Sequence, residues 1–145
     1  MSNFLKSSEA GTIGLHAMVM IANNPDRLVQ IKEIAGLFRL SEAHLAKVLN
    51  RLVKSGLIEA TRGPSGGYKL KKAPTEISIK DIYFSIEGEP ENNRCMFGIN
   101  ICDGKGCELG DFFTKVANMV DDRLSKTKLS DTALKPEFYK KIANA

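Results

Sequence analysis

The sequence lacks the features that mark membrane-spanning and secreted proteins. None of its 145 residues is a tryptophan, only two are histidines and only three are cysteines. No apolar run approaches the length that would cross a bilayer, and residues 1–10 lack the apolar centre of a signal peptide. We therefore expect a cytoplasmic protein with no membrane partner.

Motifs for catalysis are also missing. There is no internal repeat, no phosphate-binding glycine loop and no serine–histidine–carboxylate set of recognisable pattern. An enzyme would have to use its cysteines as redox thiols, and none of them belongs to a C-x-x-C pair. We therefore predict that the chain is not an enzyme.

Basic residues are in slight excess. The chain has 21 lysines and arginines against 17 aspartates and glutamates, for a net charge of +4, and its isoelectric point is near 9.0. This balance suits an anionic partner, but the same bases could form an ordinary solvated surface. The position of the bases is therefore more informative than their sum.

Residues 41–54 carry the pattern of an amphipathic helix. Its large apolar residues recur at intervals of three and four: Leu45, Val48, Leu49 and Leu52. This spacing predicts one buried face, and the opposite face is polar and largely basic. Ser41 is a suitable N-cap, and Gly56 stands where a left-handed residue would end the helix.

A predicted β-hairpin follows this helix. Residues 57–60 and 68–70 have the composition of short strands, and the turn between them, Arg62 to Gly67, is rich in glycine. A basic helix followed by such a hairpin is typical of a winged helix. In that fold one part enters the major groove of DNA, and the other reaches a neighbouring groove or the phosphates.

The candidates for contact with DNA form two groups. Those on the predicted helix are Ser41, Glu42, Ala43, His44, Lys47 and Arg51. Those at the hairpin turn are Arg62, Gly63 and Ser65. Ala43 can make only an apolar contact, for example with a thymine methyl group, whereas a narrow minor groove would attract the Arg62 guanidinium.

Two further amphipathic segments precede this unit. Residues 8–23 have a plausible buried stripe, made of Ile13, Ala17, Met18, Ile21 and Ala22. Residues 30–38 have another, made of Ile31, Ile34, Ala35 and Phe38. Because only two residues separate the second segment from Ser41, we predict a helix-turn-helix.

A large apolar stripe marks a predicted long helix over residues 109–125. Its members are Leu109, Phe112, Phe113, Val116, Ala117, Val120 and Leu124. A stripe of this size should not remain in water. It packs either on its own domain or on a second copy of the chain.

The three cysteines, Cys95, Cys102 and Cys107, lie in a polar, glycine-containing loop. This loop follows a helix that we expect to begin at a capping box formed by Ser78 and Asp81. A structural disulfide would be unusual in the cytosol and would leave one thiol over. The spacing is not that of a zinc ribbon, yet soft thiolates grouped in one short loop suit zinc or an iron–sulfur cluster.

The hairpin carries a specific resemblance to a known family. The sequence Arg62-Gly63-Pro64-Ser65-Gly66-Gly67-Tyr68-Lys69-Leu70 closely resembles the wing of the bacterial IscR/NsrR/CymR-type winged-helix regulators. These include the iron–sulfur cluster regulator, the nitric-oxide-sensitive repressor and the cysteine-metabolism repressor. The resemblance runs from the first predicted helix to about Leu134.

This resemblance implies a mainly α fold with a small β-hairpin wing and a long C-terminal dimerisation helix. It divides the chain into a winged helix-turn-helix at residues 1–87, a cysteine-containing loop at 88–108, and the dimerisation helix with its tail at 109–145. The dimerisation helix would cross its twofold mate. A homodimer would then place two recognition helices on one palindromic site in double-stranded DNA.

The resemblance also implies a cofactor. Cluster-binding members carry three cysteines in the corresponding loop, so we expect Cys95, Cys102 and Cys107 to bind a 2Fe–2S or 4Fe–4S cluster. Most clusters have a fourth protein ligand. The position where some members have a local histidine is Gly110 in this chain, and other members take a ligand from the first helix of the partner subunit. His16 is the leading candidate for that ligand, and the alternatives are Glu9, Glu108 and Asp111.

We therefore predict a transcription regulator whose operator affinity is set by a cluster that senses redox state, nitric oxide or iron–sulfur status. The first alternative is a cluster-free winged-helix regulator that uses its cysteines as thiol or metal sensors. The second is a metal-binding interaction protein that does not bind DNA.

Overall fold

The computed structural model describes residues 8–89 and 106–132. The helices are α1 (Glu9–Ala22), α2 (Ile31–Phe38), α3 (Glu42–Lys54), α4 (Ile79–Glu87), α5 (Glu108–Lys126) and a short 3-10 helix η1 (Leu129–Thr132); the strands are β1 (Ile58–Thr61) and β2 (Gly67–Leu70). Apart from η1, these elements lie close to the predicted segments. The prediction of a mainly α fold with a small β-hairpin is confirmed.

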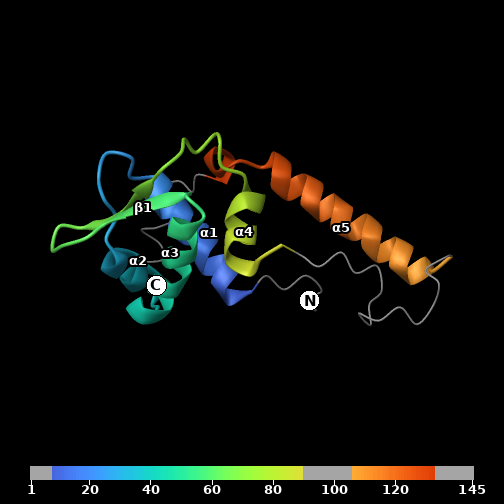
Figure 1. Cartoon of the computed structure of the whole chain (residues 1–145), viewed down its shortest axis with the longest axis horizontal. Helices are drawn as coiled ribbons and strands as arrows, with labels where there is room; N and C mark the ends of the chain where they lie inside the picture. Colours follow the sequence, from blue (N-terminus) through green and yellow to red (C-terminus); the bar gives the residue numbers. More distant parts are fainter. Residues whose placement is uncertain (1–7, 90–105, 133–145) are drawn as a thin grey trace.

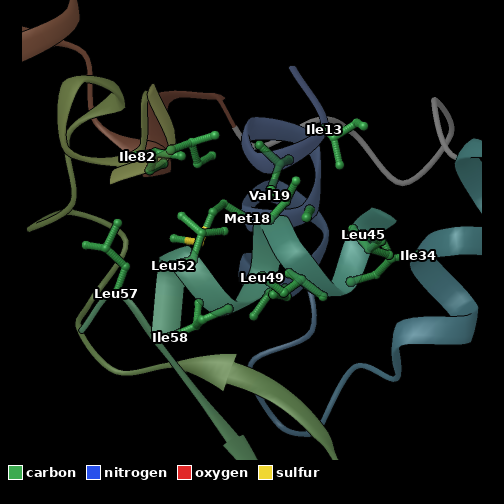
Figure 2. Packing of buried hydrophobic residues seen from close by; sticks show 14 of the residues in the cluster. Ile13, Met18, Val19, Ile34, Leu45, Leu49, Leu52, Leu57, Ile58 and Ile82 are labelled. Atoms are coloured by element: carbon green, nitrogen blue, oxygen red, sulfur yellow. The ribbon is translucent and has the colours of Figure 1, made fainter. Parts of the chain in front are cut away.

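Helix α1 is the centre of the core. It packs against α3, α4 and β2, and buried side chains from α3 and α4 meet around it (Figure 2). Of its predicted stripe, Ile13, Ala17, Met18 and Ile21 are buried, and Ala22 is partly buried. Gly11 and Gly14 let α4 approach closely, because a Cβ atom at Gly14 would lie 2.0 Å from Cδ1 of Ile86.

Helices α2 and α3 form the predicted helix-turn-helix. The connection turns at Arg39, whose φ of 54° is left-handed, a conformation that glycine usually supplies at a helix end. The N–H of Leu40 then donates to the carbonyl of Ala35 at 2.9 Å. The turn therefore forms without a glycine at its critical position.

Both ends of α3 follow the sequence prediction. The Ser41 hydroxyl oxygen accepts a hydrogen bond from the N–H of His44 at 3.1 Å. At the other end Gly56 has a φ of 75°, and the N–H of Leu57 donates to the carbonyl of Leu52 at 3.1 Å. The predicted stripe Leu45, Val48, Leu49 and Leu52 is fully buried.

The hairpin is attached to the segment before α2. Strands β1 and β2 are antiparallel, with Ala60 opposite Tyr68. Val29 and Tyr68 exchange two backbone hydrogen bonds, both of 2.9 Å. A Cβ atom at Gly67 would lie only 2.7 Å from the carbonyl oxygen of Val29, so a residue without a side chain is needed at this junction.

Helix α5 projects away from the remainder of the fold, and only its C-terminal end lies against it (Figure 1). There Lys80 pairs with Asp121 at 2.7 Å, and the N–H of Ile79 donates to the carbonyl of Thr127 at 2.9 Å. The predicted capping box of α4 is present next to this joint. Within the ranges 8–89 and 106–132, no helix has the length and apolar character needed to cross a membrane.

We predict that Gly67→Ala lowers the free energy of unfolding by about 1–3 kcal/mol, because the added methyl group meets backbone that cannot rotate away. Gly36→Ala is the matched control, since a Cβ atom at Gly36, inside α2, has nothing within 4 Å. That change should stabilise the protein by about 0.5–1 kcal/mol. Urea unfolding of both variants measures the difference, and equal effects would contradict the role assigned to Gly67.

Candidate DNA interface and cysteine loop

The residues predicted to contact DNA lie at the surface. The exposed members at the N-cap of α3 and along this helix are Ser41, Glu42, Ala43, His44, Lys47 and Arg51. At the hairpin turn they are Arg62, Gly63 and Ser65. Both groups are therefore accessible to DNA, as residues of a nucleic-acid interface must be.

An open groove brings the hairpin and the helix-turn-helix together. It is lined by Lys32 of α2, by Glu42 and Asn50 of α3, and by Arg62 and its neighbours in the turn. Lys32 and Arg62 supply positive charge, whereas the Glu42 carboxylate can accept a hydrogen bond from a cytosine amino group. The groove can thus hold a phosphate backbone at its basic side and present an acceptor to a base edge.

The outward face of α3 includes a residue that the sequence prediction missed. At about 100° per residue, Ala43, Lys47, Asn50 and Lys54 lie opposite the buried stripe. Asn50 is exposed and also lines the groove. An asparagine amide can pair with adenine. Its spacing of seven residues from Ala43 was the signal that could have identified it.

Arg51 is placed differently from the other basic residues of α3. Its Nη1 atom donates a hydrogen bond to the carbonyl oxygen of Ile86, at the end of α4, at 2.6 Å. Its guanidinium therefore has a partner inside the protein. It lies on the flank of α3 that faces α4, beside the outward face.

Several charged and polar groups near the hairpin have local partners. Lys69 pairs with Glu59 across the strands at 3.0 Å. Arg27 pairs with Glu33 at 2.9 Å, and its hydrogen bond holds the pKa of that carboxyl below the usual range. Burial raises the pKa of the Tyr68 phenol. The Arg62 side chain has no ion pair with any residue of the two described ranges, so it is available to an anionic ligand.

Cys107 is the one cysteine that falls within the described residues. It is half-buried and is the N-cap of α5, where its Sγ atom accepts a hydrogen bond from the N–H of Gly110 at 3.3 Å. Glu108 and Asp111 lie in the same first turn. Cys95 and Cys102 lie outside the described residues. Among residues 8–89 and 106–132, no three histidine, cysteine or acidic side chains form a group that could hold a metal ion.

His16 and Cys107 are not brought together within one chain. The Nδ1 atom of His16 lies 2.8 Å from the carbonyl oxygen of Thr12, and its ring meets that of Phe38 edge-on at 5.4 Å. His16 also shares an apolar pocket with Leu124. Leu124 is separated from Cys107 by most of α5, roughly 25 Å at 1.5 Å per residue. A ligand role for His16 therefore requires a second chain.

Comparison with known proteins places the chain in a family. Residues 7–134 match Rrf2, described as an iron-dependent transcriptional regulator. An HTH-type transcriptional regulator of Aquifex aeolicus is 40% identical over 127 residues, which cover 86% of this chain and 88% of that protein. The HTH-type transcriptional regulator NsrR of Bacillus licheniformis is 31% identical over 131 residues, which cover 88% and 92%.

Solved structures agree with these sequence matches. CymR, the global cysteine regulator of B. subtilis, superposes with a TM-score of 0.76 at 28% identity, and the match covers 90% of this chain and 97% of that one. IscR of T. potens superposes with a TM-score of 0.71 at 28% identity, covering 91% and 88%.

The helix-turn-helix and its hairpin define a winged-helix DNA-binding protein. The chain belongs to the Rrf2 family of transcription regulators. Its relatives are regulators and not enzymes, as the sequence predicted. The resemblance drawn from the wing motif is therefore confirmed.

We predict that Arg62→Ala weakens binding to duplex DNA and lowers the slope of log affinity against log salt by about 1, because one phosphate or groove contact is lost. Lys69→Ala is the matched control, since it removes the same charge from the same hairpin but from an ion pair with Glu59. Fluorescence anisotropy with a duplex selected from a random library measures both slopes. An unchanged slope in Arg62→Ala would remove the wing from the interface.

Proposed function

We propose that the protein is a homodimeric transcription regulator whose affinity for a palindromic operator is set by an iron–sulfur cluster held by Cys95, Cys102 and Cys107. The observation that carries the proposal is the Cys107 thiol at the start of α5, in a chain whose family is described as iron-dependent. A cytoplasmic location follows from the DNA partner.

The chemistry around Cys107 fits a thiolate ligand. The sulfur accepts from a backbone N–H, and the N-terminal end of a helix favours negative charge. Thiolates are the preferred ligands of iron–sulfur clusters. A bound cluster would link the cysteines to one another. Oxidation or loss of the cluster would remove these links.

The exposed face of α5 supports the homodimer. Leu109 is 62% exposed, Phe112 is 54% exposed and Met119 is 71% exposed. Burying one such side chain contributes about 1.5–3 kcal/mol, so several of them favour a second copy over water. The stripe could instead pack entirely on its own domain. This alternative fits less well, because Gly110 is the only residue of α5 that is buried.

The residues of the chain suggest how the signal would reach DNA. Cys107 ties the cysteine loop to the start of α5, and the Lys80–Asp121 pair ties the end of α5 to α4. The position of α5 then sets the separation of the two recognition helices in the dimer. A change in the loop shifts the population between a DNA-binding arrangement and a non-binding one.

Four residues are candidates for the fourth ligand. His16 of a second chain remains the leading candidate, because neutral imidazole is a good ligand for iron. Glu108 and Asp111 are the local alternatives, since they share the first turn of α5 with Cys107. Glu9 begins α1 and is exposed, and the family resemblance would make it, like His16, a ligand to the cluster of the partner.

A cluster-free regulator is the second candidate function. The likeness to CymR, named as a cysteine regulator, favours it. The three cysteines would then act as thiol or metal sensors on the same winged helix. A metal-binding protein that does not bind DNA is disfavoured by the family assignment.

We expect anaerobically prepared protein to contain iron and acid-labile sulfide and to absorb visible light. We expect Cys107→Ser to lose this absorbance while remaining folded.

His16→Ala should shift the spectrum and speed cluster loss if His16 is a ligand. An unchanged spectrum and unchanged loss kinetics in that variant would direct attention to Glu9, Glu108 and Asp111. Colourless, iron-free protein with reversible thiol oxidation would support the cluster-free candidate.

We expect Val120→Glu to weaken dimerisation about 100-fold or more, equivalent to about 3 kcal/mol, because it places a charge in the middle of the apolar stripe. Asn118→Glu is the matched control, since Asn118 is exposed on the opposite face of α5. Sedimentation equilibrium measures both. Val120→Glu that dimerises like the wild type would contradict the assignment of this face.

A further inference from the structure

The last turn of α4 is held by the recognition helix. The carbonyl oxygen of Ile86 accepts a hydrogen bond from Nη1 of Arg51 at 2.6 Å. The last carbonyls of a helix have no partner within the helix, and the negative end of the helix dipole attracts a cation. Arg51 therefore makes a charge-assisted bond at the place where α4 best accepts one.

The same turn is also packed against α1. The Ile86 side chain is only 3% exposed. A Cβ atom at Gly14 would lie 2.0 Å from Cδ1 of Ile86 and 3.3 Å from Cγ1 of Val48, so the three helices meet here. The Ser8 hydroxyl, at the N-cap of α1, also donates to the Glu87 carboxylate. The end of α4 therefore contacts both α1 and α3.

This turn is where the chain leaves the winged helix toward the cysteines. Gly88, with a φ of 84°, caps α4, and Cys95 follows in the sequence. The chain re-enters the described structure just before Cys107, at the start of α5. Ile86 and Glu87 are thus the last two residues of α4 before the segment that carries Cys95 and Cys102.

We propose that Arg51 is a positioning residue that couples the recognition helix α3 to the end of α4, so that the state of the cysteine-containing segment alters operator affinity through the Arg51–Ile86 hydrogen bond. The inference rests on the proposed function. It assigns Arg51 a role different from the DNA contact that its basic side chain predicted, and it identifies the route of regulation within one subunit.

A phosphate contact by Arg51 is the competing interpretation. The guanidinium has five N–H donors, and one of them reaches Ile86. The two roles differ in what they change. Loss of a phosphate contact lowers the salt slope by about 1 in both states of the protein. Loss of a positioning residue removes the difference in affinity between the states.

The test compares operator affinity with and without the cluster in wild type, Arg51→Met, Arg51→Gln and Lys54→Met. The probe is a duplex selected from a random library by the wild-type protein, and each sample is either reconstituted anaerobically with iron and sulfide or metal-free and reduced. Lys54 is exposed in the last turn of α3, so Lys54→Met removes the same charge from the same helix. Arg51→Gln removes the charge but keeps a side-chain N–H donor.

In wild type and Lys54→Met we expect the two states to differ by about 5- to 150-fold, the usual range for coupled sites. In Arg51→Met the two affinities should agree within about twofold, with an unchanged cluster spectrum and an unchanged salt slope. Arg51→Gln should restore part of the difference. An Arg51→Met variant that keeps the wild-type ratio, or that loses only salt slope, overturns the inference and leaves the proposed function standing.

A wild-type protein with equal operator affinity in both states would overturn the proposed regulation and this inference together. The result is distinct from the Arg51→Met outcome, which overturns this inference alone.

Amide hydrogen exchange provides a readout that needs no substitution. In wild type, exchange within residues 42–54 should differ between the two states. Identical exchange in this helix, alongside a real difference in operator affinity, would show that the signal bypasses α3 and would overturn the inference.

Discussion

The close approach of α1 and α4 is the constraint on which the rest of this structure depends. Gly11 and Gly14 leave no side chain between the two helices, so Tyr83 and Ile86 of α4 rest directly on the backbone of α1. This contact fixes the last turn of α4 next to α3 and the first turn next to the joint with α5. The contact between α1 and α4 therefore fixes the positions of both the DNA-binding surface and the attached end of α5.

The wing depends on a second close approach. Gly67 lies against the carbonyl of Val29, and the exchange of hydrogen bonds between Val29 and Tyr68 attaches the hairpin to the segment that leads into α2. The double glycine of the wing motif thus serves packing as well as the turn. This gives a physical reason for the motif that carried the family resemblance, and it places Arg62 at the edge of a groove shared with α3.

Local signals predicted most of the fold. The hydroxyl of Ser41, the left-handed Gly56 and the Ser78–Asp81 capping box act within a few residues, so the sequence was sufficient to place the ends of α3 and the start of α4. The left-handed Arg39 was not predictable in the same way, because arginine gives no turn signal. For the candidate site, residue type and spacing selected side chains of α3 and the wing that the structure places at the surface; their contact with DNA stays a prediction.

Two site residues needed the three-dimensional structure. Arg51 is basic and lies on the polar side of α3, which predicts a contact with DNA. Its hydrogen bond to Ile86 was not predictable, because Ile86 is far away in the sequence and a carbonyl oxygen leaves no mark on residue type. The helical pattern predicted the face of α1 on which His16 lies but not its distance from the cysteines. The structure separates His16 from Cys107 of the same chain by most of the length of α5. Asn50 carries no charge that would mark it as a DNA contact, and only its spacing on the outward face of α3 indicates it.

The attachment of α5 at one end makes it a lever. The helix is roughly 28 Å long at 1.5 Å per residue, and its pivot lies where Lys80 meets Asp121. Cys107 lies roughly 21 Å from that pivot at 1.5 Å per residue, so a tilt of about 10° would carry it through roughly 4 Å. Small adjustments among a few contacts at the base are thereby amplified at the tip, and in the reverse direction a displacement of Cys107 acts on α4 through most of the length of the helix.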